Sequence, residues 1–134
     1  SSWPMGVVQP SSVYWPNGVE PSWPLGTSDC WGNLTNTSSF AVNISASIGN
    51  MTGGTQWTPA ASPGTNIFTI KIGIAGKANV GNFTTLSNTP VAWITSMAAG
   101  NMTRWIMVFY TPTNDPFADG VLKSGKMTFE AEAA

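Results

Sequence analysis

Strict alternation between apolar and polar side chains is the feature that most limits the fold of this chain. Residues 39–48 place apolar side chains at every second position, with small or polar residues between them: Phe40, Val42, Ile44, Ala46 and Ile48. A period of two puts all of these side chains on one face of an extended strand. The pattern therefore predicts a strand with one buried face and one solvent-exposed face.

The same reasoning predicts further strands at residues 66–75, 82–86, 91–97, 102–111 and 125–133, with shorter ones at 5–9, 12–15 and 55–58. Gly- and Pro-containing turn signals separate them, and no segment has a helical period. We therefore expect one all-β domain over residues 1–134, an antiparallel immunoglobulin-like β-sandwich; a jelly roll or a closed barrel also fits the pattern. The expected core includes Phe40, Val42, Ile44, Phe68, Ile70, Ile72, Ile106, Val108 and Phe129.

Composition excludes several classes of function. Charged residues are 8% of the chain, the net charge is −1, and there is no histidine and one cysteine. A nucleic-acid surface needs clustered Lys and Arg, and most triads and transition-metal sites need His or several Cys. The longest apolar run, residues 105–110, is far shorter than the roughly 20 residues that span a bilayer. We expect no enzyme, no cofactor, no metal, no nucleic-acid partner and no membrane span.

An N-terminal arm, residues 1–32, is rich in Trp and Pro. Trp-Pro-x-Gly occurs at residues 3–6, 15–18 and 23–26, a pattern typical of turns because Pro sets φ and Gly suits the fourth position. Two interpretations remain open. The three turns cap the chain's own core with their Trp rings, or the arm docks on a partner or stacks on sugars.

The strand at residues 102–111 is apolar on both faces, so one face needs cover that a small sandwich does not supply by itself. We expect this cover to come from the arm of a neighbouring copy. The predicted subunit interface consists of apolar residues of the arm and of this strand: Trp3, Val7, Val8, Val13, Trp15, Trp23, Trp105, Met107 and Phe109.

Six Asn-x-Ser/Thr triplets occur, where chance gives roughly two or three in a chain so rich in Ser and Thr. Glycans would hydrate a surface that carries little charge. The predicted glycosylation sites are Asn33, Asn36, Asn43, Asn50, Asn82 and Asn101; unmodified asparagines in turns are the alternative.

The few candidates for chemistry favour ordinary roles. Glu130 and Glu132 share a strand face, as a glycosidase pair would, but a solvated edge explains them better. Asp115 and Asp119 are too few for a calcium loop. Cys30 is expected to be a small buried residue, with an intermolecular disulfide as the alternative.

Several short sequence segments resemble segments of secreted immunoglobulin-like sandwich modules of prokaryotic surface proteins: residues 9–13 (QPSSV), 32–37 (GNLTNT), 98–100 (AAG), 109–113 (FYTPT) and 124–131 (SGKMTFEA). The last two are similar to the closing strand pair of such modules. Some members, namely camelysin-type fibre proteins and archaeal bundling pili, build extracellular filaments. The resemblance implies a filament subunit, while the Trp-Pro-x-Gly arm is a departure from the family pattern.

We therefore expect a mature extracellular, cell-surface chain, freed of its signal peptide, that forms a head-to-tail homopolymer or surface layer. A segment such as residues 5–9 or 12–15 would add to a sheet edge of the next copy. Deletion of residues 1–27 should then leave a folded domain that does not assemble. The alternative is a carbohydrate-binding or adhesion module, which would show a planar row of exposed Trp rings.

Overall fold

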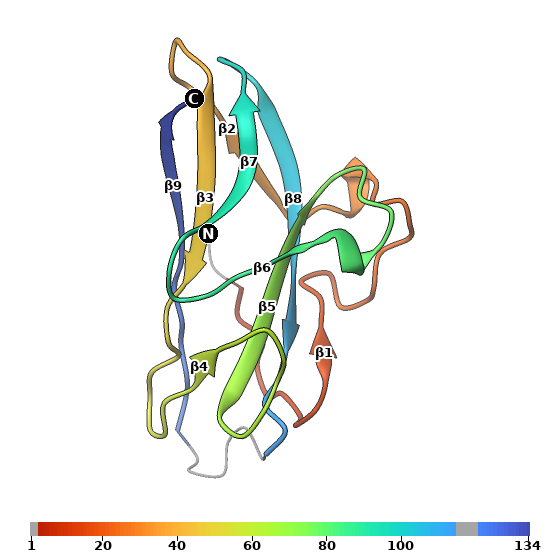
Figure 1. Ribbon diagram of the computed structural model, residues 1–134. Helices are drawn as coiled ribbons and strands as arrows, with labels where there is room; N and C mark the ends of the chain where they lie inside the picture. The colour runs from red at the N-terminus through yellow and green to blue at the C-terminus, as the bar shows by residue number, and fades with distance from the viewer. Residues whose placement is uncertain (1–2, 115–120) are drawn as a thin grey trace.

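The computed structural model describes residues 3–114 and 121–134, which form two β-sheets packed face to face (Figure 1). The larger sheet contains six strands in the order β1-β8-β5-β4, with β2 also beside β8 and β6 also beside β5. The smaller sheet has the order β7-β3-β9. The expected β-sandwich is confirmed.

The larger sheet is built around two long strands, β5 (Ile67–Ile74) and β8 (Met102–Tyr110), which pair antiparallel. Four short strands flank them: β1 (Val13–Tyr14), β2 (Gly32–Thr35), β4 (Thr58–Pro59) and β6 (Thr84–Thr85). The β4–β5 pair is parallel, so the sheet is mixed rather than wholly antiparallel.

The smaller sheet places β3 (Val42–Ile48) between β7 (Val91–Met97) and β9 (Met127–Ala133). In β3 buried and half-buried residues alternate along the whole strand. Two short 3-10 turns, η1 (Thr27–Asp29) and η2 (Val80–Asn82), interrupt the connections.

The core between the sheets is formed mainly by the inner faces of β3, β5 and β8. Seven of the nine expected core residues are buried: Val42, Ile44, Phe68, Ile70 and Ile72 on the inner faces, and Ile106 and Val108 on the outer face of β8. Phe129 is partly buried and packs against the core. Phe40 is a correction: it is 53% exposed, because β3 begins at Val42 and residue 40 belongs to the preceding loop.

Local differences from the sequence prediction occur where strands are short. Residues 5–9 form no strand, and β2 was not predicted because its four residues show a single period of alternation. The short strand expected at 55–58 is β4, displaced to Thr58–Pro59. These pairings depend on neighbours distant in sequence, which local pattern does not encode.

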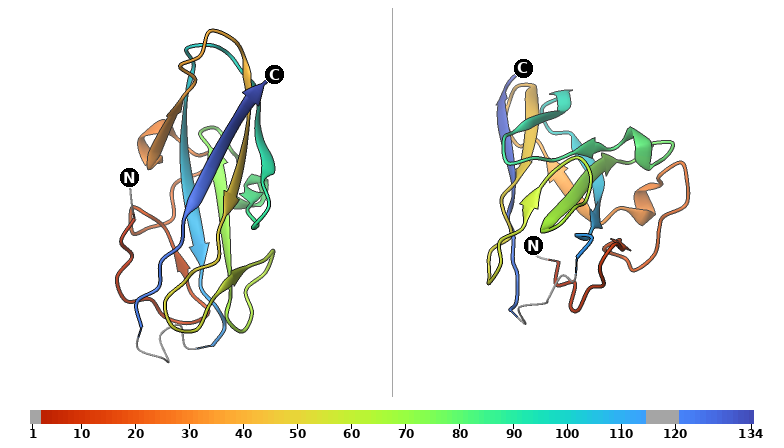
Figure 2. Two further views of the ribbon diagram at one scale, coloured as in Figure 1. Left: turned by 90° about the vertical axis from the view of Figure 1, so that its left-hand side faces the viewer. Right: turned by 60° about the horizontal axis from the view of Figure 1, so that its bottom comes forward.

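The two sides of the sandwich differ. On the side of β6 and β7 the connection between these strands closes the gap, where Leu86 is buried and the N–H of Ile48 donates to Ser87 at 2.9 Å. On the other side β9 forms the edge of the smaller sheet (Figure 2), and two grooves lie beside it, the first lined also by residues of β2.

Candidate functional site

Strand β9 is a regular edge. It pairs with β3 without a register shift from Val42↔Ala133 to Ile48↔Met127. Among the described residues no strand pairs with its other side. The opposite edge strand, β7, pairs with β3 through two register shifts, which interrupt the ladder. Because bulges discourage further pairing, β9 is the better template for an added strand.

Hydrogen-bond alternation shows which groups of β9 face outward. The N–H of Ala134 donates to Ala41 at 3.0 Å, and the N–H of Gly49 donates to Lys126 at 3.0 Å. In an antiparallel pair, bonded positions recur at every second residue. Even-numbered residues of β9 therefore bond to β3. Met127, Phe129, Ala131 and Ala133 direct their backbone N–H and C=O groups toward the open side.

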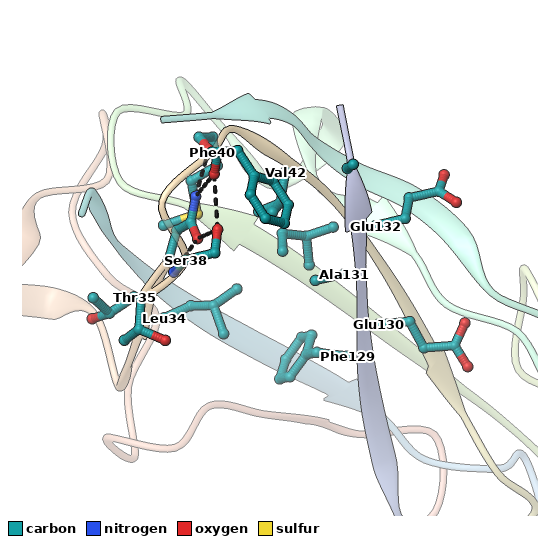
Figure 3. A pocket seen from close by; sticks show the side chains of 14 residues that line it. Leu34, Thr35, Ser38, Phe40, Val42, Phe129, Glu130, Ala131 and Glu132 are labelled. Atoms are coloured by element: carbon teal, nitrogen blue, oxygen red, sulfur yellow. Dashed lines mark hydrogen bonds between the residues drawn. The ribbon is translucent and has the colours of Figure 1, made fainter. Parts of the chain in front are cut away.

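An upper groove of about 360 Å³ lies beside the end of β9, between this strand and the β2–β3 loop. Leu34, Phe40, Val42, Phe129 and Ala131 supply its apolar lining, as Figure 3 shows. Glu130 and Glu132 also border it, but their carboxylates point away. The groove is therefore an apolar surface next to free backbone groups, which is the combination that a peptide strand recognises.

A lower groove of about 780 Å³ continues from the same ring of Phe129, which lines both. Its wall includes Met107 and Met127, and all residues of the arm segment 3–8 except Val7 line it. Lys123 is also part of the lining; its ammonium lies 5.3 Å from the ring centroid of Trp57 and donates to the carbonyl of Gly53 at 2.7 Å.

Phe129, which lines both grooves, belongs to a cluster of four aromatic rings, of which Trp31 and Trp105 also line the lower groove. Phe129 stacks on Trp93, with centroids 5.4 Å apart, and meets Trp105 edge to face at 5.2 Å. Trp31 packs edge to face on Trp105 at 5.4 Å. Such ring pairs add to the free energy of simple burial, so this end of β9 is held firmly while its outer edge stays free.

The outer face of β8 requires a correction. We expected a neighbouring copy to cover it, but the chain covers it itself: Trp15 and Leu25 of the arm, with Phe83 just before β6, form a buried cluster with Ile106 and Val108. Trp15, Trp23 and Phe83 contact one another edge to face, and the absence of a side chain at Gly73 makes room for the Phe83 ring. The Trp rings of all three Trp-Pro-x-Gly copies therefore pack on the chain's own core, Trp15 and Trp23 on the outer face of β8 and Trp3 on the inter-sheet cluster.

The three copies differ in geometry. In the second, the N–H of Gly18 donates to the carbonyl of Trp15 at 2.9 Å, closing a turn. In the third, the Trp23–Pro24 peptide is cis. Glycine φ is positive in the first two copies, at Gly6 and Gly18.

The nine residues predicted to form a subunit interface are not in one surface. Trp105, Met107 and Phe109 face the inter-sheet core and are buried, as is Trp15 on the outer face. Val13 belongs to β1 and is half exposed, and Trp23 is partly buried. Five of the nine nevertheless line the lower groove: Trp3, Val8, Trp105, Met107 and Phe109. Val7, in the same arm segment as Trp3 and Val8, is 82% exposed. Because the arm covers the outer face of β8, that face no longer needs cover from a neighbouring copy. The subunit interface itself stays a prediction.

Asn36 is a second correction, because its side chain is built into the fold. It is 6% exposed, and its Nδ2 donates to the carbonyls of Phe40 and Met97, both at 2.9 Å. Its Oδ1 accepts from the N–H and hydroxyl of Ser38. Since a glycan is attached at Nδ2, Asn36 is not available for one in this fold. The Asn-x-Ser signal here marks a loop anchor instead.

The other five triplets differ in accessibility. Asn33, Asn82 and Asn101 are exposed. Asn43 and Asn50 are half-buried, and their Oδ1 atoms accept from the N–H of Ser96 and from Asn88. These five remain predicted glycosylation sites.

The remaining candidates for chemistry are dispersed. Glu130 and Glu132 are exposed on the outer face of β9, and Asp115 and Asp119 lie outside the described residues. In the described part of the chain, no three His, Cys, Asp or Glu side chains gather as metal ligands would. Cys30 is half-buried, and its thiol donates to Gly26 at 3.5 Å. Burial raises the pKa of this thiol, with a smaller opposing effect of Arg104.

None of the seven tryptophans is exposed: three are buried and four are half-buried. A flat sugar platform requires accessible ring faces in a row. The structure therefore lacks the feature expected of a carbohydrate-binding module.

No family model, curated protein or solved structure matches this chain. Across residues 3–114 and 121–134, no helix has the length and apolarity to cross a bilayer. The sequence missed this site because the edge position of β9 and the grooves beside it follow from strand order.

Proposed function

We propose that this protein is a structural subunit of an extracellular filament or surface layer, in which a strand from one copy adds to β9 of the next. The observation that carries the proposal is the unpaired, unbulged edge of β9 beside two adjoining apolar grooves. Strand addition would pair the outward backbone groups and cover apolar side chains in one step.

Addition of this kind joins two different surfaces, a donor segment and an acceptor edge. Such a head-to-tail contact does not close on itself and propagates into an open polymer. The exposed ring of Phe40, which borders the upper groove, would become covered in the assembly. A surface with few charges and several exposed Asn-x-Ser/Thr triplets is consistent with a glycosylated, extracellular homopolymer.

The test uses a pair of proline substitutions in β9. Ala131→Pro removes an N–H that points outward and keeps every bond to β3, since proline is tolerated on an edge. Glu130→Pro is the matched control for structural damage, because it removes an N–H that bonds to β3 and should cost at least about 1 kcal/mol of stability.

We expect the unmodified protein to form filaments visible by negative-stain electron microscopy and sedimenting with concentration. The Ala131→Pro variant should remain a folded monomer with a nearly unchanged Tm. Filaments of normal appearance from Ala131→Pro would refute assembly at β9, and an unmodified protein that stays monomeric at all concentrations would refute the proposed function.

A further inference from the structure

Residues 3–8 lie on the lower groove of their own chain through side chains alone. Trp3 and Met5 pack against the core, and Val8 is 5% exposed. Within the described part of the chain, no backbone group of residues 3–8 makes a hydrogen bond.

Backbone anchoring begins at the next residue. The N–H of Gln9 donates to the hydroxyl of Tyr14 at 2.8 Å, and its carbonyl accepts from Oγ1 of Thr111 at 2.7 Å. Release of residues 3–8 therefore breaks no backbone hydrogen bond to the described residues, and β1 keeps its place beside β8.

Gly6 sets which side chains of the segment face inward. In an extended strand Trp3, Met5 and Val7 would share one face. Here Gly6 has φ +71°, and the turn that it makes buries Val8 and leaves Val7 82% exposed. A Cβ built on Gly6 meets nothing within 4 Å, so glycine serves the backbone angle and not a close contact.

Residues 3–8 and the outer edge of β9 could each supply the hydrogen-bond partners that the other lacks. Both carry backbone N–H and C=O groups without a partner among the described residues, and both border the same apolar groove. An extended segment from a second copy could satisfy both sets. The bent segment in its own chain satisfies neither.

Pro4 decides the direction of such an insertion. In an antiparallel pair with β9, residues whose side chains face the groove also direct their backbone groups toward β9. Trp3, Met5 and Val7 would then bond to β9, and Pro4, which has no N–H, would lie on the outer side. In a parallel pair the backbone of Pro4 would face β9. Because proline has no N–H, one carbonyl of β9 would then lack a hydrogen-bond donor.

We propose, building on the proposed function, that residues 3–8 of one copy insert in extended form antiparallel to β9 of the next copy, and that the bent form on the segment's own groove is the self-blocked state of the subunit. Antiparallel insertion directs Trp3 toward the upper groove, where Ala131 and Ala133 leave room beside Phe40. Met5 then lies near Phe129, and Val7 near Met127.

Gly6 is the residue that permits both states, because only glycine adopts left-handed and extended φ with similar ease. A β-branched residue at this position penalises the bent form and leaves the extended form unaffected. Gly6→Val should therefore shift the balance toward assembly by about tenfold.

The first experiment measures the critical concentration for assembly by sedimentation, with circular dichroism to verify the fold. Gly6→Val should lower the critical concentration about tenfold, and Val7→Asp should raise it at least tenfold. Val19→Asp is the matched control: Val19 is 70% exposed in the same arm but outside the segment, so it should have no effect. An unchanged critical concentration for both Gly6→Val and Val7→Asp would overturn the proposal.

The second experiment does not depend on polymerisation. A fluorescent peptide of residues 1–9 that carries Gly6→Val is titrated into the full-length protein, and anisotropy reports binding. We expect saturable binding that Ala131→Pro in the protein reduces at least tenfold, and that Val7→Asp in the peptide abolishes.

The two experiments separate the possible failures. Peptide binding by a protein that never polymerises would keep this inference and refute the filament function. Polymerisation without peptide binding, and without sensitivity to Val7→Asp, would keep the filament function and overturn residues 3–8 as the inserted segment.

Discussion

The ring of Phe129 meets the indole of Trp105 edge to face, with centroids 5.2 Å apart and planes at 72°. This contact joins β9 to β8 across the sandwich, and Phe129 also stacks on Trp93 of β7. An edge strand that pairs with one neighbour is thus fastened through its side chains. Fastening of this kind keeps the open backbone edge in a fixed position, which a strand-accepting site requires.

The first prediction concerns this fastening. Phe129→Ala should lower the free energy of unfolding by about 2–4 kcal/mol, because it removes a ring that packs on Trp93 and Trp105. Urea unfolding followed by tryptophan fluorescence measures the change. Phe40→Ala is the control, since that ring is 53% exposed, and should cost less than about 1 kcal/mol. Equal losses for the two variants would contradict the structure.

The second prediction concerns Asn36, which ties the β2–β3 loop to β7. Asn36→Ala should destabilise the chain by about 2–4 kcal/mol, because it leaves the carbonyls of Phe40 and Met97 without these donors. Asn33→Ala, at an exposed position, should change stability by less than about 0.5 kcal/mol. Thermal melts of both variants provide the comparison, and a neutral Asn36→Ala would show that the loop does not need this anchor.

The third prediction concerns modification. In protein from its native host we expect glycans on at least two of the five asparagines Asn33, Asn43, Asn50, Asn82 and Asn101, and none on Asn36. Site mapping by mass spectrometry of glycopeptides tests each position. An intact mass equal to the unmodified 14.1 kDa, or a glycan on Asn36, would contradict the expectation.

The fourth prediction concerns the arm. Deletion of residues 1–27 should unfold the domain or greatly lower its Tm, because it removes Trp15 and Leu25 from Ile106 and Val108. The packing of the arm thus leads to a different prediction from the sequence, which favoured a folded domain after this deletion. Deletion of residues 1–8 should keep the fold, since the anchors from Gln9 onward remain. Near-ultraviolet circular dichroism of both truncations distinguishes these outcomes.

The fifth prediction concerns alkaline pH. Burial raises the pKa of Cys30 above 9.0 and, with a smaller contribution from Glu20, that of Tyr110 above 10.0. A raised pKa means that the folded state favours the neutral form. The resulting stability is fully present below the unfolded values and is lost as the pH rises through the folded ones.

Urea unfolding between pH 8 and pH 11 measures this decline. The double variant Cys30→Ala, Tyr110→Phe should show a shallower decline than the unmodified protein, because it lacks both titrating groups. Parallel curves for the two proteins would contradict the assigned pKa directions.

The sequence by itself determined the β class and most of the long strands. Alternation in β3 and β5, and the doubly apolar β8, are local properties that burial on one or two faces imposes on a strand. Composition likewise limited the chemistry, because a chain without histidine and with few charges has few groups for catalysis.

Tertiary structure alone decided what covers each apolar face. The pattern of β8 showed that a second cover was needed, but the same residues of the arm could have supplied it within the chain or to a neighbour. Strand order made β9 an edge, placed Phe129 between two grooves and buried the amide of Asn36. These are relations between segments far apart in sequence, and the free energy that selects among them comes from packing and pairing that no local pattern contains.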